Sequence, residues 1–281
     1  MTITQITEDN ILQYTEIIPA ELVTDLDREY FRALAGAEDK DDPEAVIIWE
    51  LKDLEDETSP TKAVIHFLDA PDDQIARMMI SAFEQKIADD GVGLVTFEIK
   101  EMKEDLQSAF EEEGYVLTEE NSNNITVTVS ELSELRLGDR KIPDYIRSLS
   151  DINPRQFKAA VMTSVFHGRY GILDDLPFLP MTRFDQDVSS CVITDDKISG
   201  LLLVRKTMDS QYVVELFFAI QPDANKNLLN MMRFSIRSAV KYCYEEDTVI
   251  LKKHNKESSL LIEKLFPDKE GPMVIKGEKE M

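Results

Sequence analysis

Residues 212–243, YVVELFFAIQPDANKNLLNMMRFSIRSAVKYC, constrain the fold more than any other part of the chain. The segment 213–219 is rich in β-branched and aromatic residues, which predicts a buried strand, and the turn residues that follow end it. The remainder repeats apolar side chains every three or four residues, as an amphipathic helix does. A helix that begins directly after a buried strand points free backbone N–H groups at the strand end, where they can bind a phosphate.

Further apolar segments flank this strand and helix. Residues 191–193 and 201–204 lie on either side of a polar turn, which predicts a hairpin before the strand. Another apolar strand, residues 248–251, and another helix, residues 258–266, follow the long helix. The predicted order is therefore three strands, a helix, a strand and a helix, which indicates an α/β fold with a mixed sheet.

This order of elements resembles the GNAT superfamily of acyl-CoA-dependent N-acyltransferases. The family often has A-V-x-P-x-x-R-G-x-G-x-G at its strand-to-helix junction, and this chain reads AIQPDANKNLLN from residue 219 to residue 230. The Ala, the β-branched residue and the Pro match, whereas Asn225, Leu228 and Asn230 stand in the places of the pattern [QR]-x-x-G-x-[GA]. The resemblance implies a mixed, mostly antiparallel sheet flanked by helices, with acetyl-CoA as the acyl donor.

The first half of the chain repeats the order of the second. Residues 62–115 give a strand, a Pro-bearing turn, a helix with two adjacent Met, a strand and a helix, as residues 212–267 do. We therefore expect two tandem GNAT-like lobes, an acidic degenerate lobe from 1 to 131 and a candidate acyltransferase lobe from 132 to 281. Residues 125–129 alternate like the closing strand of the first lobe. The alternatives are one such domain behind an unrelated N-terminal module, and a fold unrelated to GNAT.

The first lobe departs further from the family pattern than the second. Apolar residues at helical spacing predict a helix from residue 20 to residue 35. At the strand-to-helix junction, Arg77 and Met79 stand where the family has glycines. The nearby Asp72 and Asp73 would repel a pyrophosphate. We expect this lobe to bind no CoA and to serve a structural or substrate-shaping role.

The charge of the chain excludes some classes of partner. It carries 31 basic and 55 acidic residues, a net charge of −24, which argues against nucleic-acid and anionic-membrane partners. Residues 1–130 hold 32 acidic and 9 basic residues, so nearly all of the net charge lies in the first half. An acidic surface keeps a protein soluble. Alternatively, an acidic lobe would draw a cationic amine substrate toward the second lobe.

The sequence gives no indication of a metal site, a disulfide or a membrane segment. Cys191 and Cys243 fall within predicted elements and are expected to be free thiols of a reducing cytosol. His66, His167 and His254 are too far apart in sequence for metal-ligand spacing, so we expect no bound metal. No apolar stretch is as long as a membrane helix and the N-terminus has no signal-peptide pattern, so we expect a cytoplasmic protein.

The resemblance also implies catalytic groups. An amine must lose a proton and attack a thioester, and the leaving thiolate takes a proton from an acid. The family often places a glutamate base on the central strand, where this chain has Glu215. Burial of a lone carboxylate would raise its pKa, which suits a base; an outward-facing residue is the alternative. The family's Tyr acid is absent, because Ile262 and, in the first lobe, Phe110 stand in its place.

Residues that would contact CoA and the acceptor follow from the same resemblance. The cofactor-binding candidates are Ile220, Asn225, Lys226, Asn227, Leu228, Asn230 and Arg233. A lysine can bind phosphate as a point charge, whereas a Leu side chain would occupy space that a Gly leaves open to the phosphate. The loop residues that would line the acceptor side are His167, Arg169, Tyr170, Asp174 and Asp175.

Together these features predict an N-acetyltransferase that acts on a small-molecule amine. The alternative is a catalytically inactive GNAT-fold protein that serves as a binding or assembly module. Only PMVIKGEKEM follows the last predicted helix, where a full GNAT domain usually has two strands. A strand from the other lobe, or from a second chain in a homodimer, would complete the sheet.

Overall fold

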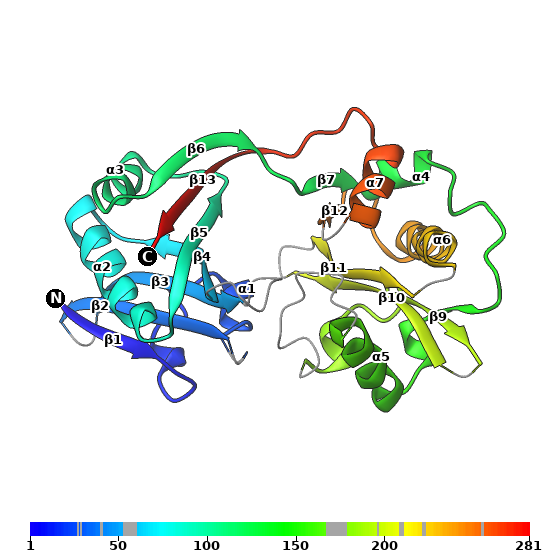
Figure 1. The fold of residues 1–281 in the computed structure, drawn as a ribbon, viewed down its shortest axis with the longest axis horizontal. Coiled ribbons are helices and arrows are strands. Elements are labelled where there is room, and N and C mark those ends of the chain that lie inside the picture. The colour runs from blue at the N-terminus through cyan, green and yellow to red at the C-terminus, as the bar shows by residue number, and fades with distance from the viewer. Residues whose placement is uncertain are drawn as a thin grey trace. The chain divides into compact units, whose positions relative to one another are not determined.

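The computed structural model describes residues 1–26, 28, 30–39, 42–52, 61–166, 179–195, 197–207, 211–220, 223–253 and 256–281. The chain forms two compact units, which we call lobe 1 and lobe 2 (Figure 1). Lobe 1 comprises Met1–Ser122 and Met273–Met281, and lobe 2 comprises Asn123–Pro272. The expected division after residue 131 differs from these units in two places, because residues 123–131 belong to lobe 2 and residues 273–281 belong to lobe 1.

Lobe 1 contains a seven-stranded sheet with the order β1-β2-β3-β4-β5-β13-β6. Its strands are β1 (Thr2–Ile6), β2 (Phe31–Asp39), β3 (Asp42–Lys52), β4 (Thr61–Asp69), β5 (Val92–Ile99), β6 (Val116–Asn121) and β13 (Met273–Glu280). Its helices are η1 (Ile11–Gln13), α1 (Ala20–Val23), α2 (Asp73–Ala88) and α3 (Glu104–Glu112). The neighbouring strands are antiparallel except for β4 and β5, which are parallel.

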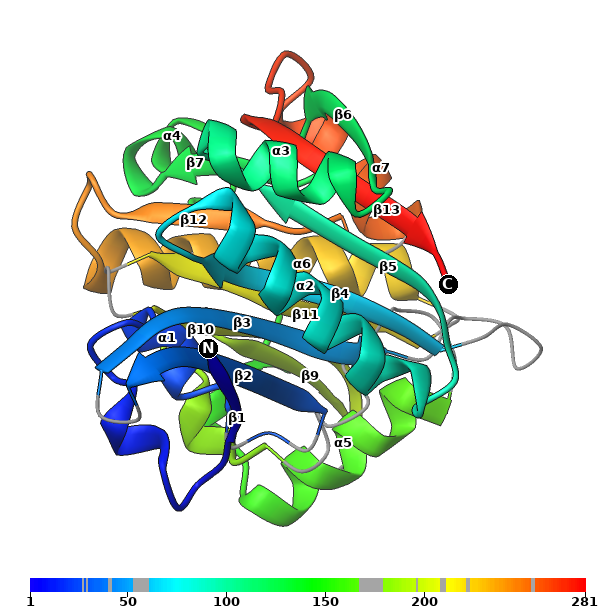
Figure 2. The ribbon, with the colours of Figure 1, turned by 90° about the vertical axis from the view of Figure 1, so that its left-hand side faces the viewer.

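Helices α2 and α3 lie on one face of the lobe 1 sheet (Figure 2). The core beneath them holds the fully buried rings of Trp49, Phe83 and Phe110. A second cluster on the opposite face packs Tyr14 and Ile18, from the chain between β1 and β2, against the strands β2 and β3. Sheet residues therefore alternate between two separate cores, as the two-residue period of a strand requires.

Lobe 2 contains a six-stranded sheet with the order β7-β12-β11-β10-β9-β8. Its strands are β7 (Ile125–Thr128), β8 (Ile146–Ser148), β9 (Ser190–Thr194), β10 (Lys197–Lys206), β11 (Tyr212–Ala219) and β12 (Thr248–Leu251). Its helices are α4 (Val129–Glu134), η2 (Leu149–Asp151), α5 (Pro154–Phe166), η4 (Met181–Arg183), α6 (Ala224–Tyr242) and α7 (Lys256–Leu265). Only the pair β11 and β12 is parallel.

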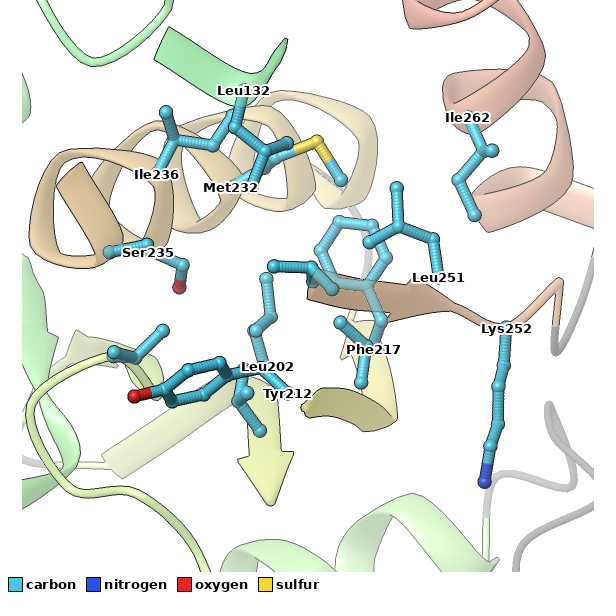
Figure 3. A pocket seen from close by; sticks show the side chains of 15 residues that line it. Leu132, Leu202, Tyr212, Phe217, Met232, Ser235, Ile236, Leu251, Lys252 and Ile262 are labelled. Carbon is cyan, nitrogen blue, oxygen red and sulfur yellow. The ribbon is translucent and has the colours of Figure 1, made fainter. Parts of the chain in front are cut away.

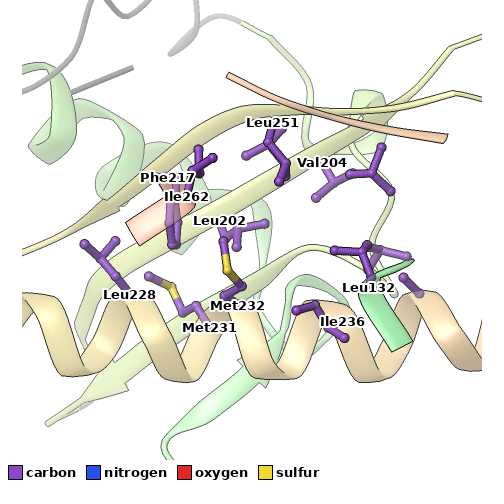
Figure 4. Close-up of a cluster of buried hydrophobic side chains, with 14 of the residues drawn as sticks. Leu132, Leu202, Val204, Phe217, Leu228, Met231, Met232, Ile236, Leu251 and Ile262 are labelled. Atoms are coloured by element: carbon purple, nitrogen blue, oxygen red, sulfur yellow. The ribbon is translucent and has the colours of Figure 1, made fainter. Parts of the chain in front are cut away.

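Two helices on opposite faces bury the lobe 2 sheet (Figure 1). The apolar face of α6 packs on one side, where Leu228, Met231 and Ile236 join side chains of β10 and β11 (Figure 4). On the other side, Phe157 and Val161 of α5 pack against alternate residues of the same strands. The expected hairpin, central strand and long helix are thus present at β9–β10, β11 and α6.

Each lobe is completed by a strand from the other half of the chain. Strand β13, at the C-terminus, lies between β5 and β6 of lobe 1 and pairs with both, so that Ile275 faces Ile99 on one side and Glu119 on the other. Strand β7, from the first half, pairs with β12 at the edge of the lobe 2 sheet. Residues 125–129 therefore do not close the first lobe, and the strand expected from the other lobe is present.

The predicted helix from residue 20 to residue 35 is wrong beyond Val23. Residues 31–39 form β2, which is hydrogen-bonded to β1 on one side and to β3 on the other. Ala33 and Ala35 are buried on one face and Leu34 on the other. The two neighbouring strands satisfy the backbone of this alanine-rich segment, and this non-local pairing overrides the helix propensity of alanine.

Gly277 is expected to be essential for the close packing of β13. It pairs with Phe97 across the sheet, and a Cβ atom at this position would lie 2.1 Å from the ring of Phe97. We expect Gly277→Ala to lower the free energy of unfolding of lobe 1 by about 1–3 kcal/mol, because the buried ring must shift to make room. Urea unfolding followed by tryptophan fluorescence measures this, since the only tryptophan, Trp49, lies in the lobe 1 core. Met273→Ala, which changes an exposed side chain of the same strand, should leave stability nearly unchanged.

Candidate functional site

Strands β11 and β12 of lobe 2 separate part-way along their length. Their parallel pairing ends at Val214 and Leu251, so the rest of β11, from Glu215 to Ala219, has no partner in β12. The pairing of β11 with β10, its neighbour on the other side, contains a β-bulge at this point. Leu203 pairs with Leu216 and Val204 with Val214, which leaves Glu215 as the extra residue. The bulge therefore marks the place where the two strands diverge.

Glu215 is held by two cations, one from each neighbouring strand or strand end. Its Oε1 lies 2.8 Å from Nη2 of Arg205 on β10, and its Oε2 lies 2.7 Å from Nζ of Lys252, the residue after β12. The Glu215 side chain is only 9% exposed. Burial alone would raise the pKa of Glu215, but the charges of Lys252 and Arg205 hold this pKa far below its ordinary value.

The expectation that burial would raise the pKa of Glu215 is therefore wrong. The sequence places no cation beside Glu215, because Arg205 and Lys252 come from other segments of the chain. A carboxylate with so low a pKa stays ionised and holds a proton poorly, so it is a weak general base near neutral pH. The ion pairs of Glu215 instead join β10, β11 and the end of β12 at the point where β11 and β12 diverge. Glu215 as the catalytic base remains a prediction.

The N-terminus of α6 follows β11 at the open end of this divergence. Asp223 precedes the helix, and its side chain makes no capping hydrogen bond. The first turn contains no acidic residue, and Asn225 and Lys226 are exposed there. The first N–H groups of a helix lack partners within the helix, and the helix dipole favours an anion beside them. This terminus is therefore open to an anionic group.

The corresponding helix of lobe 1 begins differently. The side chain of Asp72 precedes α2 and accepts a hydrogen bond from the backbone N–H of Ile75 at 2.8 Å. Asp73 adds a second carboxylate in the first turn. Lobe 1 thus supplies its own negative charge at this helix terminus, which satisfies a donor that a phosphate would otherwise use.

The structure brings only some of the cofactor-binding candidates to the α6 N-terminus. Asn225 and Lys226 lie there, whereas Leu228 is 2% exposed and packs in the core, as Figure 4 shows. The backbone N–H of Ile220 donates to the carbonyl of Ser199 at 2.8 Å, and Asn227 is buried in the first turn.

Asn230 and Arg233 lie further along the helix. At 1.5 Å per residue they are about 9 and 14 Å from the first helical residue. Nδ2 of Asn230 donates to the hydroxyl of Tyr145, and Nη1 of Arg233 donates to Oδ1 of Asn230 at 2.9 Å. Asn230 therefore ties α6 to the segment before β8, and Arg233 holds the Asn230 side chain from within the helix. The sequence pattern cannot distinguish this role from phosphate binding.

The remaining candidates are either in the core or outside the described residues. Ile262 is 2% exposed and Phe110 is fully buried, so neither of the two residues that replace the family's Tyr offers a polar group. The acceptor-side candidates His167, Arg169, Tyr170, Asp174 and Asp175 lie outside the described residues, as does the Pro222 of the junction motif.

A narrow apolar cavity of about 40 Å³ lies between α6 and the sheet (Figure 3). Leu202, Phe217 and Met232 are among the side chains that line it, and the Lys252 side chain extends away from them. A space of this size holds one or two water molecules at most. It is a gap in core packing, not a place for a cofactor.

Lobe 1 contains a second charged cluster at the equivalent place, which the sequence reading missed. Ile48 pairs with Phe67 and Trp49 with Ile65, which leaves His66 as the extra residue of a bulge in β4. Nε2 of His66 lies 3.0 Å from Oε2 of Glu50 on β3. The sequence contains a signal for this cluster, because Glu50 interrupts the apolar residues of β3 and His66 interrupts those of β4.

Glu50 is also ionised in the folded state. Arg28 and Lys52 lie 3.3 and 3.0 Å from its carboxylate oxygens, and its side chain is 2% exposed. Burial alone would raise the pKa of Glu50, but the hydrogen bond from His66 and the charges of Lys52 and Arg28 hold this pKa below its ordinary value. Both lobes thus carry a buried, ion-paired carboxylate beside the bulge.

Comparison with known proteins identifies the fold. No family model matches the sequence, and no curated protein matches it. A tandem GNAT protein from the clavulanic acid biosynthesis pathway superposes with a TM-score of 0.63 and 10% identity, over 99% of this chain and 98% of that one. A Pyrococcus horikoshii protein assigned as an acetyltransferase superposes with a TM-score of 0.55 and 12% identity, over 100% and 89%.

A third structure gives the same result. A conserved protein of unknown function from Enterococcus faecalis, assigned as an N-acyltransferase, superposes with a TM-score of 0.55 and 9% identity, over 99% of this chain and 72% of that one. At these identities the likeness establishes the fold alone. The chain has the GNAT fold in two tandem GNAT-like lobes, as the sequence predicted.

The described residues contain neither a membrane-spanning helix nor a cluster of metal ligands. None of their helices is both long and apolar enough to cross a membrane. The same residues contain no group of three or more His, Cys, Asp or Glu side chains placed to hold a metal ion. The thiol of Cys191 is buried, and burial raises its pKa to about 12, which makes it a poor nucleophile.

Proposed function

We propose that lobe 2 binds acetyl-CoA and transfers its acyl group to a small-molecule amine. The observation that carries this proposal is the pair of diverging parallel strands, β11 and β12, followed by an α6 N-terminus that the side chain of its N-cap residue, Asp223, does not cap. The names of the similar solved structures, which include acetyltransferases, support it. The pyrophosphate would bind the first N–H groups of α6 with Lys226 beside it, and the thioester arm would enter where the strands diverge.

The transfer forms one bond and breaks another. The amine nitrogen attacks the thioester carbon, the new C–N bond forms, and the C–S bond breaks to release the thiolate of CoA, which takes up a proton. Because the ion-paired Glu215 holds a proton poorly, the amine loses its proton to solvent. We therefore expect the rate to follow the pKa of the amine itself. The acidic surface of residues 1–130 would favour an amine that is cationic in solution.

A specific observation favours the second candidate, a GNAT-fold module without catalysis. The place of the family's Tyr acid is occupied in lobe 2 by Ile262, which is buried in the core cluster. The Tyr that would protonate the thiolate is therefore absent, and the Glu215 that would accept the amine proton is held in ion pairs. Such a protein would bind acyl-CoA or a partner without transferring the acyl group.

Titration calorimetry of acetyl-CoA with the intact protein and two matched variants tests the proposed site. Asn225→Glu adds a carboxylate to the exposed first turn of α6 and should weaken binding about tenfold or more, because like charge opposes the pyrophosphate at the helix terminus. Gln74→Glu makes the same change on the exposed first turn of α2 in lobe 1 and should leave binding unchanged.

Three results separate the candidate functions. Saturable binding that only Asn225→Glu weakens, together with release of free CoA thiol when amines are added, supports the transferase. The same binding without thiol release from any amine supports the non-catalytic module. No heat with millimolar acetyl-CoA, or equal weakening by both variants, would exclude the site at α6.

A further inference from the structure

A cavity of about 510 Å³ lies on the face of the lobe 1 sheet opposite α2 and α3. Its strand residues, such as Val64 and Thr96, alternate with residues such as Ala63 and Val95 that pack beneath the helices. The lining residues are Lys52, Lys62, Val64, Thr96, Phe97, Glu98, Val116, Thr118, Glu120, Lys276, Gly277 and Glu278. All of them belong to lobe 1.

One end of this cavity carries a lysine that forms no ion pair with any residue that the structure describes. Lys52 and Lys62 are directly opposite each other on β3 and β4, and like charges at such a position destabilise a sheet. Lys52 forms an ion pair with Glu50 at 3.0 Å, whereas Lys62 makes no ion pair or hydrogen bond with any described residue. Burial and the charge of Lys52 lower the pKa of Lys62. An anionic group that contacts Lys62 would relieve this repulsion.

The other end carries carboxylates. Lys276 and Glu120 are 2.8 Å apart and neutralise each other. Glu278, on β13, is exposed and makes no ion pair with a described residue. Lys62 and Glu278 both line the cavity, so the two groups border the same space. Strand β5 lies between them, where Leu94 pairs with Lys62 on β4 and Thr96 pairs with Glu278 on β13.

We propose that this cavity binds a small zwitterion, with its carboxylate at Lys62 and its ammonium group at Glu278 and Glu98. Strands β4 and β13 are two strand spacings apart, and Lys62 and Glu278 are also offset by two residues along the strands, so their backbones are about 12 Å apart. That separation suits a ligand whose ammonium and carboxylate groups are several bonds apart, such as an ω-amino acid or a dipeptide. The volume of the cavity accommodates a molecule of this size.

The balance of charge distinguishes a zwitterion from a simple anion or cation. Three lysines and three glutamates line the cavity, so its net charge is close to zero. Residues 1–130 otherwise carry a large excess of acidic side chains, which disfavours the approach of an anion. The α2 N-terminus carries its own aspartate cap, so we expect binding without acyl transfer.

Three probes of equal chain length test the proposal by calorimetry with the intact protein. They are 6-aminohexanoate, which carries both charges, hexanoate, which carries only the carboxylate, and hexylamine, which carries only the ammonium group. We expect saturable binding of 6-aminohexanoate and at least about tenfold weaker binding of the other two, because each lacks one ion pair. Hexanoate or hexylamine binding as tightly as 6-aminohexanoate would overturn the zwitterion assignment. The absence of saturable heat with 6-aminohexanoate at about 10 mM, roughly the weakest dissociation constant that calorimetry resolves, would overturn it too.

Two variants place the ligand in the cavity. Lys62→Gln removes the unpaired ammonium group and should abolish the binding of 6-aminohexanoate, and it should not unfold lobe 1 because it also removes the repulsion from Lys52. Lys86→Gln, an exposed lysine of α2, is the matched control and should bind as the parent protein does. Trp49 fluorescence verifies that both variants are folded. Unchanged binding by folded Lys62→Gln would overturn the proposal, whatever the outcome of the acetyl-CoA titration.

Discussion

Removal of residues 273–281 is expected to unfold lobe 1 while lobe 2 keeps its structure. Strand β13 lies between β5 and β6, so its loss leaves two sets of backbone hydrogen bonds unpaired in the interior of a sheet. It also removes Ile275 from its packing against the lobe 1 core and the ammonium group of Lys279 from its contacts with Glu84. Lobe 2 takes no strand from this segment, because β7 completes its sheet.

The fluorescence of Trp49 distinguishes the two lobes in this experiment. Trp49 is fully buried beneath α2, so unfolding of lobe 1 should shift its emission to longer wavelength. A synthetic peptide with the sequence of residues 273–281 should restore the native emission by occupying the vacant strand position, and a scrambled peptide should not. Native emission from the truncated protein would show that lobe 1 folds without β13.

Substitution of Glu215 by Ala is expected to destabilise lobe 2 by about 3 kcal/mol, the low end for a buried ion pair, because it leaves the largely buried Arg205 and the half-buried Lys252 without their counter-charge. Adding Lys252→Ala should recover part of the loss, since one of the two uncompensated cations is then removed. Glu263→Ala removes an exposed carboxylate that pairs with Lys253 and should cost less than about 1 kcal/mol. Hydrogen exchange of the β11 amides measures these effects. An equal loss in Glu215→Ala and Glu263→Ala would contradict the role of the ion pairs.

The same ion pairs predict the response of lobe 2 to acid. The pKa of Glu215 is far lower in the folded state than its ordinary value of 4.5. A lowered carboxyl pKa contributes stability above the ordinary pKa, and this contribution is lost as the pH falls below it toward the folded-state pKa. The protection of the β11 amides against hydrogen exchange, corrected for the intrinsic exchange rate at each pH, should therefore fall progressively below about pH 4.5 in the parent protein and much less in Glu215→Ala.

Part of the candidate site follows from the sequence and part does not. Residues 219–230 place the end of a strand and the start of a helix, and local spacing is sufficient to locate Asn225 and Lys226 at that helix terminus. The same spacing cannot show that Leu228 packs into the core while Asn230 bonds Tyr145, because both contacts involve distant segments. For the same reason, the sequence identified the glutamate of β11 but gave the wrong direction for its pKa.

The sequence by itself determined the tandem repeat, the β11–α6 unit and the contrast between the two helix N-termini. These features depend on the period of apolar residues and on residue types within one turn of each other, which are local properties of the chain. Tertiary structure alone decided that residues 31–39 form a strand, and that β7 completes the lobe 2 sheet while β13 completes the lobe 1 sheet. It alone also decided that Arg205 and Lys252 keep Glu215 ionised. In each case the deciding partner is far away in sequence, so hydrogen bonding across strands or charge across the sheet sets the outcome.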